Sequence, residues 1–97
     1  MSETTEVASQ DEAQRLAQRS DDLCARGHFA LAEPVARRAL RAARRVASEQ
    51  GPVVAEAHRR LGTVLFRVGR ADESRRVLHR ALRIYNTGFD AFAWGFR

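Results

Sequence analysis

Apolar residues recur every three or four positions along most of the chain, which is the spacing of one helix face. A capping box formed by Ser9 and Glu12 predicts the start of a first helix that runs to about Arg26. Residues 1–8 before it are polar and are predicted to be disordered. A second helix is expected over residues 30–49, with arginines outside its apolar face.

Glycines mark the breaks between the predicted helices. Gly27 lies where a left-handed residue would end the first helix, and Gly69 lies where one would end a third helix over residues 52–68. Gly51 and Pro52 separate the second helix from the third, and Pro34 is expected to make the second helix start late or bend. A fourth helix, residues 71–85, is expected to bury Ser74, Val77, Leu78, Ala81, Leu82 and Tyr85.

The second half of the chain repeats the first. A shift of 42 residues places Leu23 on Leu65 and Gly27 on Gly69, and it aligns Val35-x2-Arg38-Ala39-Leu40-Arg41 with Val77-x2-Arg80-Ala81-Leu82-Arg83. Such a period is typical of stacked helix pairs, in which each pair needs a neighbour to cover its apolar face. We therefore expect an all-α fold with two antiparallel helix pairs, residues 9–50 and 51–86, followed by a distinct segment, residues 87–97.

These residues carry a resemblance to the tetratricopeptide repeat family, whose pattern is Trp-x2-Leu-Gly-x2-Tyr, then Ala-x3-Phe. The second unit reads His58-x2-Leu61-Gly62-x2-Leu65, then Ser74-x3-Leu78, and the first reads Leu16-x2-Arg19-Ser20-x2-Leu23, then Ala32-x3-Ala36. The period of 42 exceeds the family's usual 34 and resembles the longer repeats of kinesin light chains and their bacterial relatives. The resemblance implies an α-solenoid that binds a protein or peptide, without catalysis and without a cofactor.

The resemblance also implies which side chains form the concave binding surface. In this family that surface comes mainly from the first helix of each pair, which corresponds here to Gln14, Ala17, Asp21 and Cys24, and to Glu56, Arg59, Thr63, Phe66 and Arg67. Arg59, Phe66 and Arg67 are the favoured partner contacts, with Asp21 and Thr63 beside them; solvated surface charge is the alternative for the arginines. The residues with which some members clamp a terminal carboxylate are not matched here.

The distribution of charge along the chain indicates what kind of partner it binds. All 17 basic residues are Arg, so a Schiff-base lysine and the lysine of a phosphate-binding loop are excluded. Residues 1–33 hold seven acids and three Arg, whereas residues 34–97 hold 14 Arg and five acids. This asymmetry favours an acidic partner for the second part, or pairing between the two parts. Nucleic acid is the less favoured partner, because no recognised binding motif accompanies the arginines.

The remaining reactive side chains predict no site of their own. Cys24 is the only cysteine, so no internal disulfide forms, and a reducing cytoplasm is expected. It has no histidine at i±3 or i±4 within its own predicted helix, and His28, His58 and His79, in a turn and two different helices, lack the spacing of metal ligands. No apolar run is long enough to span a membrane. We expect no metal, no nucleophile and no membrane insertion.

The last nine residues hold four aromatic side chains, Phe89, Phe92, Trp94 and Phe96. One interpretation is that residues 87–97 form a truncated helix that caps the open end of the stack. The other is that this segment docks into a partner, or that the chain is a folded leader whose Phe89–Arg97 tail an enzyme modifies. Because a two-unit stack exposes two apolar ends, a homodimer is expected in preference to a monomer.

Overall fold

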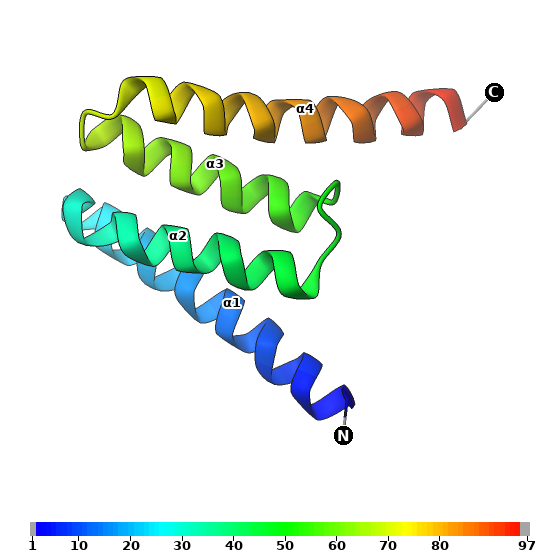
Figure 1. Ribbon diagram of the computed structural model, residues 1–97, viewed down its shortest axis with the longest axis horizontal. Helices are drawn as coiled ribbons and strands as arrows, with labels where there is room; N and C mark the ends of the chain where they lie inside the picture. Colours follow the sequence, from blue (N-terminus) through cyan, green and yellow to red (C-terminus); the bar gives the residue numbers. More distant parts are fainter. Residues whose placement is uncertain (1, 96–97) are drawn as a thin grey trace.

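The computed structural model describes the backbone of residues 2–95 and the side chains of residues 10–87. It contains α1 (Ser2–Ala25), α2 (Phe29–Val46), α3 (Pro52–Arg67) and α4 (Ala71–Gly95), and residues 2–95 include no strand. Figure 1 shows the helices as antiparallel neighbours in chain order, with α3 between α2 and α4. The predicted all-α fold with two helix pairs is confirmed.

The two turns within the helix pairs have the same backbone geometry. Gly27 and Gly69 have φ values of 79° and 89°, a region that glycine enters without steric cost. After each glycine one amide donates back across the turn, from His28 to the Leu23 carbonyl at 2.8 Å and from Arg70 to the Leu65 carbonyl at 2.9 Å. These bonds satisfy carbonyls at the helix ends, as the predicted glycine caps require.

The prolines act differently from each other. Pro52 is the first residue of α3, where its missing amide hydrogen costs no helical hydrogen bond, as predicted. Pro34 lies inside α2, which begins at Phe29, so the prediction that this helix would start late is wrong. The bond that Pro34 cannot donate would have gone to the carbonyl of Ala30, and both residues are exposed. Water can therefore satisfy that carbonyl.

Both terminal helices are longer than predicted. Helix α1 begins at Ser2, so residues 2–8 are helical and the predicted disorder does not describe them. Helix α4 continues through Asn86 and Gly88 to Gly95, past the start of α3 in Figure 1. The Thr87 hydroxyl donates to the Arg83 carbonyl at 2.8 Å, within one continuous helix, so no separate capping helix starts at this residue. None of the helices in the described part of the chain is apolar over enough length to cross a membrane.

The side chains of the aromatic segment lie outside this description. Phe89, Phe92 and Trp94 belong to α4 by their backbone only, and Phe96 falls beyond residue 95. The interpretations of these four residues as cap contacts or as docking contacts therefore remain predictions.

Small side chains dominate the core. Alanine occupies most of the buried positions of α2, and valine, leucine and alanine occupy most of those of α3, so the two helices approach closely. Ile84 is the α4 residue that joins this cluster. The core consists of Ala32, Ala36, Leu40, Ala43, Val54, Ala55, Ala57, Leu61, Val64, Leu65 and Ile84.

Three apolar side chains of α4 are exposed, contrary to prediction. Leu78, Leu82 and Tyr85 retain 36%, 53% and 40% of their accessible surface, because among residues 2–95 no other helix covers this side of α4. Phe66 of α3, at 64%, lies beside Leu78 and Leu82. Phe66, Leu78 and Leu82 form an apolar patch on this uncovered side, against which a further helix pair could pack.

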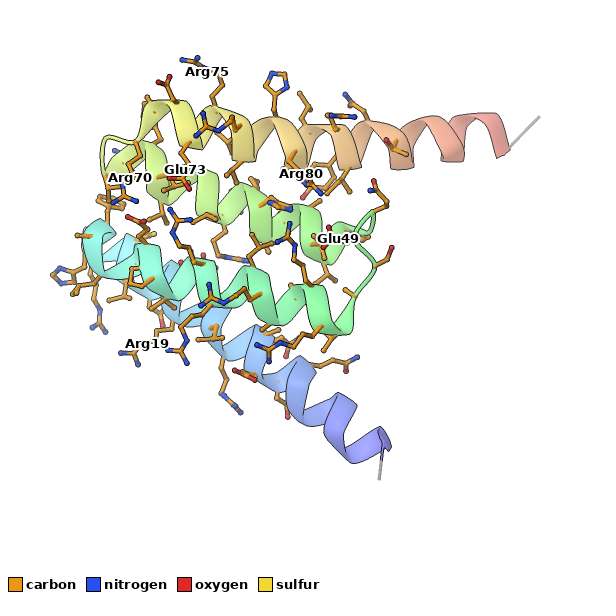
Figure 2. The ribbon with its side chains drawn as sticks, in the orientation of Figure 1. Arg19, Glu49, Arg70, Glu73, Arg75 and Arg80 are labelled. Atoms are coloured by element: carbon orange, nitrogen blue, oxygen red, sulfur yellow. The ribbon has the colours of Figure 1, made fainter. Side chains whose placement is uncertain are left out.

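Ion pairs join the helices near the Gly69 turn. Glu33 of α2 accepts from Arg70 at 2.9 Å, and Arg37 of α2 bonds Glu73 of α4 at the same distance. Figure 2 shows Arg70 and Glu73 at this end of the molecule. Partly exposed pairs of this kind contribute about 0–1 kcal/mol each, so they orient the helices more than they stabilise them.

Candidate functional site

An open groove lies between α1 and α3, with α2 as its floor. Figure 1 shows α1 crossing the bundle at an angle, so that its N-terminal half points away from the other helices. The two helices touch only weakly, which leaves a groove of about 330 Å³. Its lining is Ala13, Gln14 and Ala17 of α1, Ala39 and Ala43 of α2, and Pro52, Val53, Glu56, Ala57 and Arg60 of α3.

The floor and walls of the groove are made of small apolar side chains. Ala13, Ala39, Ala43 and Ala57 are buried, and Val53 is half exposed above them. Small side chains leave space that a large apolar side chain of a ligand can fill. The polar groups are confined to Gln14, Glu56 and Arg60. The groove therefore suits a segment that is mainly apolar on one side.

Direct contacts between α1 and α3 close one end of the groove. The Arg60 guanidinium bonds the Asp21 carboxylate at 2.8 Å, and the Arg60 side chain is only 16% exposed. Further along α3, the Arg67 guanidinium lies 5.3 Å from the centre of the Phe29 ring, within the range of a cation–π contact. The ion pair with Asp21 thus joins α3 to α1, and the contact with Phe29 joins α3 to the first residue of α2.

A carboxylate with two hydrogen-bond donors stands on the α3 wall. Arg59 donates to Glu56, and the Tyr85 hydroxyl of α4 donates to the same carboxylate at 2.9 Å. The Arg59 hydrogen bond lowers the pKa of Glu56, partial burial opposes that change, and the Tyr85 bond reinforces it. Glu56 is therefore ionised at neutral pH and can accept a further donor from a ligand.

The predicted contact residues divide among three places. Asp21 lies beside the groove and holds Arg60, while Arg59 lies on α3 and holds Glu56. Thr63 is exposed, and its hydroxyl donates to the Arg59 carbonyl at 3.0 Å within α3. Phe66 belongs to the apolar patch at the open end, and Arg67 stacks on Phe29. The five residues do not form one cluster.

The groove lining includes residues that sequence reasoning did not select. Gln14, Ala17 and Glu56 were assigned to the concave surface by resemblance, and the structure places all three on the groove. Val53 and Arg60 were not assigned. Their positions on α3 follow the helical spacing of Glu56, so Val53, Glu56 and Arg60 share one face. This helical spacing could have identified Val53 and Arg60 as lining residues from the sequence alone.

Cys24 and His58 are packed among other side chains. Burial raises the pKa of the Cys24 thiol, and the Asp21 charge adds to this effect, against weaker opposition from Ser20, Arg60 and Arg67. A protonated thiol is a poor nucleophile. His58 is buried and its pKa is lowered, mainly by that burial. Among the residues with described side chains, no three His, Cys, Asp or Glu residues lie together as metal ligands would.

Comparison with known families gives one match. The family model described as tetratricopeptide repeat matches residues 11–87, which include most of α1, all of α2 and α3, and α4 as far as Thr87. Comparison with curated proteins and with solved structures gives no match.

Proposed function

Because its residues 11–87 match that model, the chain belongs to the tetratricopeptide repeat family, and we propose that the groove between α1 and α3 binds a short segment of a partner protein. Tetratricopeptide repeats are protein-interaction modules, which gives the class of partner. The observation that carries the proposal is the lining of this groove: four buried alanines beneath a few polar groups. Such a lining provides apolar contact with few directional bonds.

The polar groups suggest how the segment is oriented. Glu56 accepts hydrogen bonds and remains ionised, so it suits a backbone amide or a basic side chain of the ligand. Gln14 can donate and accept on the opposite wall. Apolar side chains of the segment would enter the space above the alanines. The proposed role is binding without catalysis, in the cytoplasm; the lone cysteine, which allows no internal disulfide, is consistent with a reducing compartment.

We also propose that the repeats belong to the longer class with a 42-residue period. Residues 42 positions apart share burial in the two helix pairs: Ser20 and Gly62, Ala32 and Ser74, and Ala39 and Ala81 are all buried. The capping glycines Gly27 and Gly69 keep the same spacing. Equal burial at this spacing supports a structural unit of that length.

A second copy of the chain is proposed as a further partner. The apolar patch formed by Phe66, Leu78 and Leu82 faces outward at the open end of the stack. Pairing of two such patches about a two-fold axis would cover both at once. We therefore expect a homodimer that leaves the groove between α1 and α3 free.

Selection from a displayed peptide library tests the groove. Peptides that bind the wild-type chain should bind the Val53→Asp variant at least tenfold more weakly, because a charge then lies against the apolar ligand. Leu31→Asp is the matched control: Leu31 is 62% exposed and Val53 is 52% exposed, but Leu31 lies outside the groove. If both variants weaken binding equally, or if selection yields no binder, the groove is not the site.

A further inference from the structure

Two rows of arginine lie along α2 and α4. Arg37, Arg41 and Arg44 are four and three residues apart on α2, so they share one helix face. Arg76, Arg80 and Arg83 have the same spacing on α4. The ion pair between Arg37 and Glu73 shows that the faces are turned toward each other, with α3 between the helices. None of these residues lines the groove between α1 and α3.

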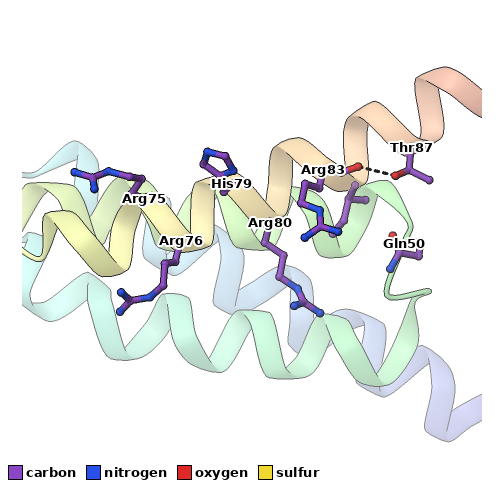
Figure 3. Close-up of a pocket in the computed structure, with 8 residues that line it drawn as sticks. Gln50, Arg75, Arg76, His79, Arg80, Arg83 and Thr87 are labelled. Atoms are coloured by element: carbon purple, nitrogen blue, oxygen red, sulfur yellow. Dashed lines mark hydrogen bonds between the residues drawn. The ribbon is translucent and has the colours of Figure 1, made fainter.

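The α4 row lines a second open groove, of about 530 Å³, which reaches the connection between α2 and α3 at Gln50. In Figure 3, Arg76 and Arg80 point from α4 toward α2, whereas Arg75 and His79 point to the other side of the helix. Thr87 and Gln50 lie at the far end of this basic groove, beside Arg83. Its polar lining thus consists mainly of hydrogen-bond donors.

Few carboxylates compensate these guanidinium groups. At one end of the groove Glu73 binds Arg37 at 2.9 Å. At the other, Glu49 lies between Arg44, at 2.8 Å, and Arg80, at 3.6 Å. Figure 2 shows Glu49 and Arg80 toward the end of the molecule opposite to Arg70 and Glu73. Three of the six arginines, Arg41, Arg76 and Arg83, have no carboxylate within ion-pair distance among residues 10–87. Arginine keeps its charge throughout the accessible pH range, so an excess of positive charge persists.

The existing contacts indicate what kind of anion fits. Glu49 is a single side-chain carboxylate held between guanidinium groups from two helices, and the unpaired arginines offer the same donors to a carboxylate from outside. The described lining contains no Phe, Tyr or Trp on which a base could stack, and the His79 ring points to the other side of α4.

We propose that the basic groove along α4, on the side from which Arg76 and Arg80 point toward α2, binds a segment of a partner protein that is rich in Asp and Glu. It is a second surface, separate from the groove between α1 and α3, and it rests on the proposed function only for the class of partner. Arg76 and Arg83 provide free charge, and Arg44 and Arg80 can share their carboxylate with the incoming segment.

Fluorescence anisotropy with a labelled peptide of eight glutamates tests this proposal. At 50 mM NaCl the Arg76→Gln/Arg83→Gln variant should bind the peptide at least tenfold more weakly than the wild type. The matched control is Arg19→Gln/Arg26→Gln, which removes two exposed arginines of α1 and of the turn after it and thus changes the net charge equally. The control should lose less than twofold, and binding to the wild type should weaken at 200 mM NaCl.

Three outcomes would overturn the proposal. Equal losses in both double variants would mean that net charge, and not this groove, attracts the peptide. Tighter binding of duplex DNA or RNA than of the glutamate peptide at 150 mM NaCl would assign the groove to nucleic acid. Loss of peptide binding in Val53→Asp would place the peptide between α1 and α3, which leaves the proposed function intact.

Discussion

The imidazole of His58 is buried on α3, and neither of its ring nitrogens has a hydrogen-bond partner among the described residues. Burial lowers its pKa, the charges of Arg44 and Arg80 lower it further, and Glu49 opposes them. An unpaired buried polar group is unfavourable, so this residue weakens the core in which it sits.

The free energy of unfolding of the chain should depend on pH because of His58. Since the pKa of His58 is lower in the folded chain than its usual 6.5, the unfolded chain binds the proton first as pH falls. The folded chain therefore keeps its full stability above pH 6.5, where the His58 imidazole is neutral, and loses stability as the pH falls below that value. Urea unfolding at pH 7.5 and pH 5 should show this loss in the wild type.

The variant His58→Leu should be nearly independent of pH between 7.5 and 5. It should also be more stable than the wild type at pH 5, by roughly 1 kcal/mol or more, because two unsatisfied nitrogens are removed. His28→Gln, in an exposed turn, should keep the wild-type dependence. An unchanged pH dependence in His58→Leu would refute this account.

At the scale of elements, α3 and α4 approach closely at Gly62. A Cβ atom at this position would lie 2.5 Å from two atoms of the Leu78 side chain. The Ser74 hydroxyl donates to the Gly62 carbonyl at 2.7 Å across the same contact. The small residues of the repeat pattern therefore set the distance between these two helices.

A double-mutant cycle tests that contact. Gly62→Ala alone should destabilise the chain, because Leu78 must leave its position. In the Leu78→Ala background the same change should stabilise it by about 1 kcal/mol, since alanine forms helix better than glycine. Urea midpoints of the four variants give the coupling. Equal effects in the two backgrounds would mean that the Leu78 side chain does not limit the approach.

For the whole molecule, the apolar patch of Phe66, Leu78 and Leu82 shares no lining residue with the groove between α1 and α3, whereas it meets the basic groove at Arg75 and His79. If the patch pairs with a second copy, the groove between α1 and α3 stays accessible and the complex carries it twice. Two linked sites raise the apparent affinity for a partner with two binding segments.

Light scattering at micromolar concentration tests the pairing. The wild type should have the mass of two chains, and Leu82→Glu should have the mass of one, because a buried charge would face the same patch of its partner. Leu31→Glu, an exposed leucine of α2 outside the patch, should remain a dimer. A wild-type chain with the mass of a monomer would contradict the proposal.

Local chemistry was readable from the sequence alone. Gly27 and Gly69 end their helices and Pro52 begins one, because backbone sterics and missing donors act within a few residues. The spacing of apolar positions and the breaks between them predicted the four helices. The resemblance placed Gln14, Ala17 and Glu56 on the surface that bears the groove.

Other features depend on how the helices are arranged. Ile84 is buried whereas Leu82 is exposed, although both are apolar and lie on one helix, because burial depends on which side has a neighbour. The divergence of α1 from α3 decided that Val53 and Arg60 line a groove while Phe66 does not. The pairing of Arg80 with Glu49, and the lack of such a partner for Arg76, likewise result from packing between helices distant in sequence. Spacing along one helix defines a face, but only the tertiary structure decides what that face meets.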